Sequence, residues 1–144
     1  MNKKNDVTRG IGFQRGFYSV LRFLIGGIYC LINSFSYELY RPEHKTFLLL
    51  SNHNTDLDCF SNVIGTRSHM KFVAAERVTQ GFGGRFVRML ANPIPRRKGA
   101  PTEEVVELIL ENLRSGISVG MYAEGLKSWD GETSFISERT ASLA

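Results

Sequence analysis

The stretch that most constrains the fold is residues 46–58, where an unbroken apolar run passes abruptly into polar residues. The run from Phe47 to Leu50 is short and does not alternate, which is typical of a strand buried on both faces. In the polar part, Asp58 stands five residues after His53. Ligands of open α/β sheets bind at the carboxyl ends of strands. A histidine with a carboxylate partner at that place is a candidate general base.

Two more segments have the pattern of strands, and helical patterns separate them. Residues 70–75 and 118–123 are predicted strands, and residues 56–65 are a predicted helix. A second predicted helix has Thr102 as its N-cap and Gly116 just past its end. The side chains expected to point inward from these helices are Leu57, Phe60 and Ile64 in the first, and Val105, Val106, Ile109, Leu110 and Leu113 in the second. Alternating strands and helices at these intervals predict an α/β fold with a mostly parallel sheet flanked by helices. Residues 36–40 alternate weakly and are a candidate first strand.

The connection between residues 76 and 99 has two parts with different patterns. Its first part is predicted to be helical through Leu90, with a helix break or a close backbone approach at the glycine-rich residues 81–84. These glycines do not form a phosphate-binding loop, because no Gly-Lys-Ser/Thr follows them. The second part, residues 92–99, holds two prolines that keep the backbone extended, and three cations follow.

The amino-terminal residues combine positive charge with an apolar stripe. Apolar side chains recur at steps of three and four from Phe13 to Phe35, which predicts one amphipathic helix. The cations of this region are Lys3, Lys4, Arg9, Arg15 and Arg22, against the carboxylate of Asp6. The uncharged stretch from Phe23 to Tyr37 has 15 residues, whereas a spanning helix needs about 20. We therefore expect a helix in the interface of an anionic membrane, the alternative being a helix packed on the protein's own core.

Composition narrows the class of protein. Of the 144 residues, 42% are apolar, 22% charged and 11% aromatic, which excludes a disordered chain. Cys30 and Cys59 lack ligand-like spacing, so neither a disulfide framework nor a zinc site follows, and a reducing compartment is expected. The net charge of +4 comes without a nucleic-acid-binding motif, so no nucleic-acid partner is expected. We expect residues 1–35 to be a basic, membrane-associated segment and residues 36–144 to be the α/β domain.

Three polar clusters follow the predicted strands and the extended segment. They are Asn52-His53 with Asp58, then Arg96-Arg97-Lys98, then Glu124-Gly125 with Lys127-Ser128. If the strands are parallel, all three clusters share one edge of the sheet. His53 can then take a proton from a hydroxyl, Asp58 can orient the imidazole, and the cations can hold a phosphate.

Each cluster also has a plainer explanation when it is taken singly. The three would then be a capped helix turn, a solvated loop and an ordinary strand-to-turn junction. Their common order along the chain favours a hydroxyl nucleophile on a phosphate-bearing substrate. His44 and His69 have no comparable setting and are expected to be surface or loop residues.

The same residues resemble the first three motifs of the glycerophospholipid acyltransferases, in particular the PlsC-like 1-acylglycerol-3-phosphate acyltransferases. The resembling segments are Asn52-His53 with Asp58, Ile94-Pro95-Arg96-Arg97, and Glu124-Gly125-Leu126-Lys127-Ser128. The resemblance runs from about residue 13 to residue 135. A His-x4-Asp pattern alone occurs often by chance, whereas its combination with Glu-Gly-x-Lys-Ser-x-x-Gly-Glu at this distance is specific.

The resemblance implies a glycerolipid acyltransferase-like fold and transfer of a fatty acyl group from acyl-CoA or acyl-carrier protein to the hydroxyl of a lysophospholipid such as lysophosphatidate. It implies His53 as general base, Asp58 as its orienter, and Arg96 or Arg97 as the contact to phosphate. The acceptor site would include Glu124, Gly125, Lys127 and Ser128. No cofactor, metal or covalent acyl-enzyme is implied, and the amino-terminal helix would lie on the cytoplasmic face of a membrane.

Two departures from the family pattern matter. Lys127 stands where the third motif more usually has arginine, so a point charge replaces a bidentate donor. Family members continue for many tens of residues, through a further strand and a proline-containing fourth motif, so the resemblance implies an incomplete domain here. The alternative function is therefore a truncated, catalytically inactive remnant that binds lipid or membrane.

Overall fold

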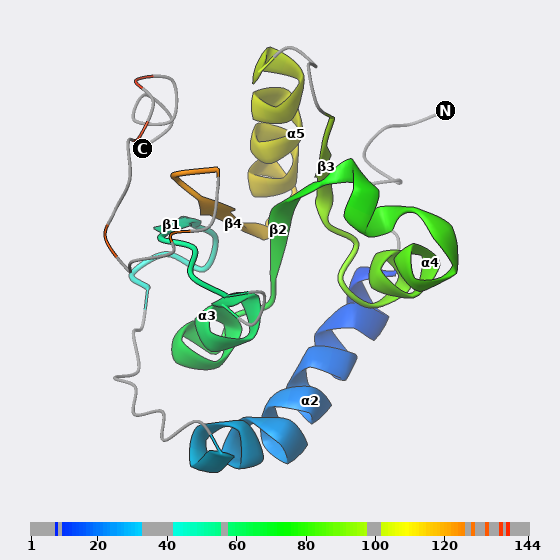
Figure 1. The fold of residues 1–144 in the computed structure, drawn as a ribbon, viewed down its shortest axis with the longest axis vertical. Coiled ribbons are helices and arrows are strands. Elements are labelled where there is room, and N and C mark those ends of the chain that lie inside the picture. The colour runs from blue at the N-terminus through cyan, green and yellow to red at the C-terminus, as the bar shows by residue number, and fades with distance from the viewer. Residues whose placement is uncertain are drawn as a thin grey trace.

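A parallel sheet of four strands stands at the centre of the described chain in the computed structural model (Figure 1). The structure describes residues 8, 10–32, 42–55, 58–97, 102–125, 128, 132, 136 and 138. The strands are β1 (Leu48–Ser51), β2 (Met70–Ala75), β3 (Ile94–Arg96) and β4 (Ser118–Tyr122). Their order across the sheet is β1-β4-β2-β3, and each neighbouring pair is parallel. The predicted α/β fold with a parallel sheet is therefore confirmed.

The last of these strands in the sequence, β4, lies inside the sheet, between β1 and β2. Leu48 pairs with Val119 on one side of β4, and Met70 pairs with Ser118 on the other. Val119 and Met70 are fully buried, as expected where both faces of a parallel sheet are covered. The core cluster around this strand consists of Ile94, Val105, Ile109 and Val119.

The helices α3 (Asp58–Thr66) and α5 (Thr102–Arg114) lie on opposite faces of the sheet (Figure 1). The connection from β1 to β2 through α3 and the connection from β3 to β4 through α5 cross the sheet in opposite directions. Because such crossovers are right-handed, the two helices lie on opposite faces. Two expected inward positions are wrong, since Phe60 is 38% exposed and Leu110 is 37% exposed. In α5 the buried residues Val105 and Ile109 stand four apart, and this spacing turns Leu110 outward. Leu57 lies outside the described residues.

The helical region after β2 consists of a short 3₁₀ helix, η1 (Glu76–Thr79), and the helix α4 (Gly81–Leu90). Gln80 between them is extended, with φ −93° and ψ 158°, and Gly81 has φ +69°. A Cβ atom at Gly84 would overlap the backbone of Thr79. The glycines therefore mark both a helix break and a close backbone approach, which confirms the two possibilities drawn from the sequence.

The extended backbone predicted around the two prolines is confirmed, and part of it forms the strand β3. It pairs in parallel with β2, with Ile94 opposite Val73 and Pro95 opposite Ala74. β3 is an edge strand, where a proline is tolerated because its missing N–H can face away from the sheet. Ile94 is buried in the core, and this anchors Arg96 beside the carboxyl ends of the other strands.

The long helix α2 (Ile11–Ile32) contacts α3 and α4 and exposes much of its apolar surface. Gly26 is buried against Ile64 of α3, and the side-chain amide of Gln14 donates to the carbonyl of Met89 in α4 at 3.4 Å. The large apolar side chains that α2 exposes include Phe13, Val20, Phe23, Leu24, Ile28, Leu31 and Ile32. Among the described residues, no helix combines the length and apolar character that crossing a membrane requires.

Three expectations about the amino-terminal part are not tested by the structure. The candidate strand at residues 36–40 lies outside the described residues. Contact of α2 with a membrane surface stays a prediction, and so does the division into residues 1–35 and 36–144.

Candidate active site

The carboxyl ends of β1, β3 and β4 bring the predicted site residues to one edge of the sheet. His53 follows β1, Arg96 ends β3, and residues 124–125 follow β4. The backbone N–H of Ser128 donates to the carbonyl of His53 at 2.7 Å. The segment after β4 therefore lies against the loop after β1, as the parallel topology requires.

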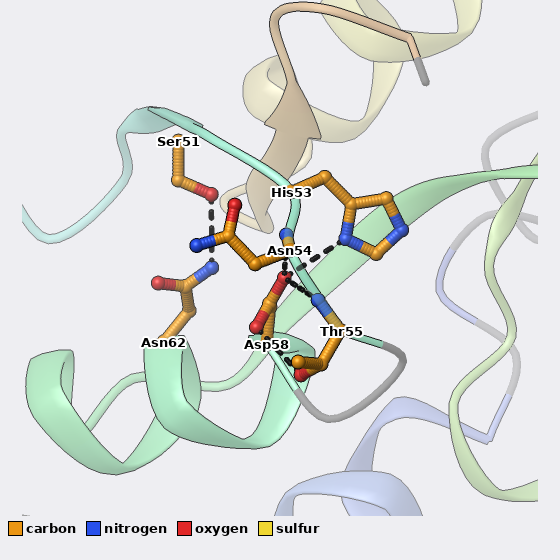
Figure 2. A network of polar contacts seen from close by, with 6 residues as sticks. All are labelled: Ser51, His53, Asn54, Thr55, Asp58 and Asn62. Atoms are coloured by element: carbon orange, nitrogen blue, oxygen red, sulfur yellow. Dashed lines mark hydrogen bonds and ion pairs between the residues drawn. The ribbon is translucent and has the colours of Figure 1, made fainter. Parts of the chain in front are cut away.

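His53 and Asp58 form the central pair of this edge (Figure 2). His53 Nδ1 lies 2.9 Å from Asp58 Oδ2, and the two side chains are 18% and 22% exposed. The imidazole comes from the loop after β1 and the carboxylate from the first residue of α3, so the strand-to-helix turn closes the pair. Asn62 Nδ2 donates to Ser51 Oγ at 3.1 Å and ties α3 to the end of β1.

The Asp58 carboxylate also accepts hydrogen bonds from Asn54 and Thr55 of the loop. The backbone N–H groups of Asn54 and Thr55 donate to Oδ2 at 2.7 and 2.8 Å, and the Thr55 hydroxyl donates to Oδ1 at 2.9 Å. Burial by itself would raise the pKa of Asp58, but the hydrogen bonds from Thr55, His53 and Asn54 outweigh it and lower that pKa.

The ionised state of Asp58 determines the proton position on the imidazole. A carboxylate only accepts hydrogen bonds, so Nδ1 of a neutral His53 carries the proton and Nε2 keeps a lone pair. The plainer explanation drawn from the sequence was that Asp58 caps a helix turn. The bond of its carboxylate to the Thr55 N–H does organise the start of α3, so this explanation also applies. Capping and orientation of the imidazole are compatible here.

An aromatic stack that sequence reasoning missed covers one face of the imidazole. The rings of His53 and Tyr122 are 3.9 Å apart between centroids and 13° from parallel. Tyr122 in turn stacks on Phe72 of β2, at 5.9 Å and 20°. The pairing of Ser51 with Tyr122 in the sheet explains the stack, because it places the end of β4 beside the loop that holds His53. The sequence signal was an aromatic residue directly before the Ala-Glu-Gly junction.

The two neighbouring arginines at the end of β3 have different surroundings. Arg97 Nε lies 3.3 Å from Glu76 Oε1, in an ion pair whose two side chains are well exposed. Arg96 Nη1 lies 3.1 Å from the place that a Cβ atom would take at Gly125, which has φ +68°. Arg96 therefore reaches the segment after β4, whereas Arg97 reaches the residue after β2.

The remaining predicted site residues are placed only in part. Glu124 is half-buried, and both of its carboxylate oxygens are buried without a hydrogen-bond partner among the described residues. The Ser128 hydroxyl donates to the carbonyl of Glu132 at 2.8 Å. Lys98 and Lys127 lie outside the described residues. The structure thus brings His53, Asp58, Arg96, Gly125 and the Ser128 backbone to one edge, while their chemical roles stay predictions.

Comparison with known proteins adds the family. The acyltransferase family model matches residues 35–144, which is most of the chain and includes the whole sheet. The chain therefore belongs to the acyltransferase family, that is, to the PlsC-like glycerophospholipid acyltransferases. The general chemistry of this family is acyl transfer to a lipid. Comparisons with curated proteins and with solved structures gave no match. The resemblance drawn from the motifs is thereby confirmed at the level of the family.

Proposed function

We propose that the chain transfers a fatty acyl group from acyl-CoA or acyl-carrier protein to the hydroxyl of a lysophospholipid, with lysophosphatidate as acceptor. The observation that supports this most directly is the 2.9 Å bond from His53 to the ionised Asp58, at the sheet edge that Arg96 also reaches. The family match supports acyl transfer to a lipid in general. The acceptor, the donor and the residue roles are the proposal.

In the proposed step His53 acts as general base. Nε2 takes the proton of the acceptor hydroxyl while the hydroxyl oxygen attacks the carbonyl carbon of the thioester. The C–S bond then breaks, and the leaving thiolate takes the proton back from the imidazolium, so the products are an ester and a free thiol. Asp58 stays ionised and stabilises the imidazolium through Nδ1. No covalent acyl-enzyme is part of this step, so Ser51 and Cys59 need no nucleophilic role.

Arg96 is the arginine that we assign to the phosphate of the acceptor. Its guanidinium lies beside Gly125, whereas Arg97 is engaged with Glu76. A guanidinium can bind a phosphate through two parallel hydrogen bonds. In the proposal Glu124 and Gly125 shape the acceptor site, and Lys127 and Ser128 contribute to it. The exposed apolar side chains of α2 would hold the chain on the cytoplasmic face of an anionic membrane.

The test is acyl transfer by the purified chain reconstituted with phospholipid. The His53→Ala variant is expected to lose about 10²- to 10⁴-fold in rate, because the proton acceptor is gone. The Asp58→Ala variant should lose less but still strongly, since the imidazole loses its orientation. His44→Ala is the matched control, because His44 is exposed and precedes β1. A His53→Ala variant as active as the control would overturn the catalytic proposal.

A second comparison separates the two arginines. Arg96→Ala is expected to raise KM for the lysophospholipid about tenfold or more, because a charge-assisted hydrogen bond is lost. Arg97→Ala removes only an exposed ion pair with Glu76 and should leave KM within about twofold. The reverse pattern would reassign the phosphate contact. Vesicle binding without any turnover in the unmodified chain would instead favour the lipid-binding remnant.

A further inference from the structure

A cavity of about 270 Å³ opens at the edge of the sheet opposite to His53. Its walls come from α2, from the loop before β2 and from the residues just before β1 and β4. All four strands are parallel, so these amino ends lie a full strand length away from the candidate active site. The proposed acyl transfer makes no use of this cavity.

The charged side chains that line the cavity are all positive. They are Arg15 and Arg22 of α2, Lys45 before β1 and Arg67 before β2. Within the described ranges, no carboxylate lines the cavity, and none lies within 4.0 Å of any of these four cations. Four cations around one cavity repel one another, so an anion that bound among them would be stabilised by all four.

Backbone carbonyls hold two of these guanidiniums in place. Arg15 Nη2 donates to the carbonyl of Gly116 at 3.4 Å, and Arg22 Nη1 donates to the carbonyl of Arg67 at 3.1 Å. A guanidinium has five N–H donors, so one such bond orients the group without exhausting it. Arg15 and Arg22 are also two turns apart on α2, which puts both on the side facing the cavity.

His69 also lines the cavity. It lies in a loop, as expected, and is partly buried. Both of its ring nitrogens are buried and have no hydrogen-bond partner among the described residues. Its ring packs edge-on against Tyr18, at 5.1 Å and 76°. Burial, with added repulsion from Arg15 and Lys71, lowers the pKa of His69 to about 4. A neutral imidazole offers one N–H donor, and a buried donor without an acceptor is unfavourable.

We propose that this cavity, which we call the α2 cavity (Arg15, Arg22, Lys45, Arg67 and His69), is a second anion site that binds a phosphate group. Paired guanidiniums favour a planar or tetrahedral oxyanion with several acceptor oxygens. The group could come from a phospholipid head group or from free phosphate. The head group is favoured, because the helix that supplies Arg15 and Arg22 also exposes Phe23 and Ile28. The proposal does not depend on the function of His53.

The test uses the full chain and two probes. Binding of inorganic phosphate is measured by calorimetry, and binding of phosphatidylcholine vesicles with or without phosphatidate is measured by co-sedimentation. Arg22→Gln and Arg67→Gln are each expected to weaken phosphate binding about tenfold. Arg85→Gln is the matched control, because it removes the same charge from the exposed part of α4, outside the cavity. Circular dichroism and thermal midpoints identify any variant that fails to fold.

His69→Phe provides the test that does not alter net charge. It is expected to weaken phosphate binding severalfold while keeping the ring contact with Tyr18. Cavity-dependent binding of both probes, with phosphate displacing phosphatidate vesicles, would support the head group as ligand. Cavity-dependent binding of phosphate alone would support the site with free phosphate as ligand. Equal weakening by Arg22→Gln, Arg67→Gln and Arg85→Gln, or no binding of either probe, would overturn the proposal.

Discussion

Arg96 Nη1 lies 3.1 Å from the position that a β-carbon would occupy at Gly125, so the end of β3 reaches the turn after β4 across the end of β2. A side chain at residue 125 would crowd this guanidinium, and the left-handed backbone there, with φ +68°, favours glycine. The glycine of the Glu-Gly pair is therefore the residue that leaves room for the arginine assigned to phosphate.

We predict that Gly125→Ala raises KM for the lysophospholipid by about two- to threefold, because the added methyl group pushes the Arg96 guanidinium aside by a few tenths of an ångström. The matched control is Gly81→Ala, since Gly81 has φ +69° and nothing within 4 Å of an added Cβ. Both variants carry similar backbone strain, which is measured as a loss of thermal stability. Equal changes of KM in the two variants would show that strain, and not the displaced arginine, explains the effect.

The stack of Tyr122 on His53 gives a second prediction. Tyr122→Leu is expected to reduce the rate of acyl transfer by up to about tenfold, because an aromatic pair contributes about 0.5–1.5 kcal/mol to holding the imidazole. Tyr122→Phe keeps the ring and should stay within about twofold of the unmodified chain. The measurement is the initial rate at saturating substrate. A Tyr122→Leu variant with an unchanged rate would mean that Asp58 alone is sufficient to orient His53.

Two adjacent glycines of α4 give a prediction about stability alone. Gly84→Ala should destabilise the fold by about 1–3 kcal/mol, because a Cβ atom there overlaps the backbone of Thr79. Gly83→Ala meets nothing within 4 Å and should stabilise α4 by about 0.5–1 kcal/mol. Denaturant midpoints of the two variants measure the difference. Effects of the same sign would contradict the close approach of η1 and α4.

The partly buried His69, whose ring nitrogens are buried, predicts a dependence of stability on pH. Its pKa is about 4 in the folded chain and about 6.5 in an unfolded chain, so between these values the unfolded state binds more protons. The stability contributed by the neutral ring is complete above pH 6.5 and is lost as the pH falls through 4. Denaturant midpoints in phosphate-free buffers should therefore decline less steeply over this range in His69→Gln. The control is His44→Gln, at an exposed position, and matching slopes in the two variants would contradict the prediction.

Local patterns were sufficient to predict the elements but not the order of the strands. The apolar run at residues 47–50 and the pattern of residues 70–75 encode strands through burial and alternation, and the structure has strands there. Nothing local places β4 between β1 and β2, because pairing depends on side chains far apart in the sequence. β3 was predicted only as an extended, strand-like segment, for a related reason. An edge strand with a proline has too few apolar positions to be distinguished from an extended loop.

The features of the candidate site also fall into those that the sequence could predict and those that it could not. His53 and Asp58 could be named from the sequence, because a short loop at a strand end forces them together. The stack with Tyr122 and the divergence of Arg96 from Arg97 could not, since both arise from the register of paired strands. The loop position of His69 agrees with the expectation, but its contact with Tyr18 could not be foreseen, because α2 is far away in the sequence.

The interior position of β4 has a consequence for how the chain acquires its fold. As a nascent chain leaves the ribosome, β1 and β2 emerge well before the strand that joins them, and they have no pairing with each other in the final sheet. Insertion of β4 thus joins β1 to the pair of β2 and β3. Such a long-range pairing is expected to set the folding rate. Until then the Leu-rich β1 is an unpaired apolar segment, which a chaperone or the lipid surface itself would need to shield.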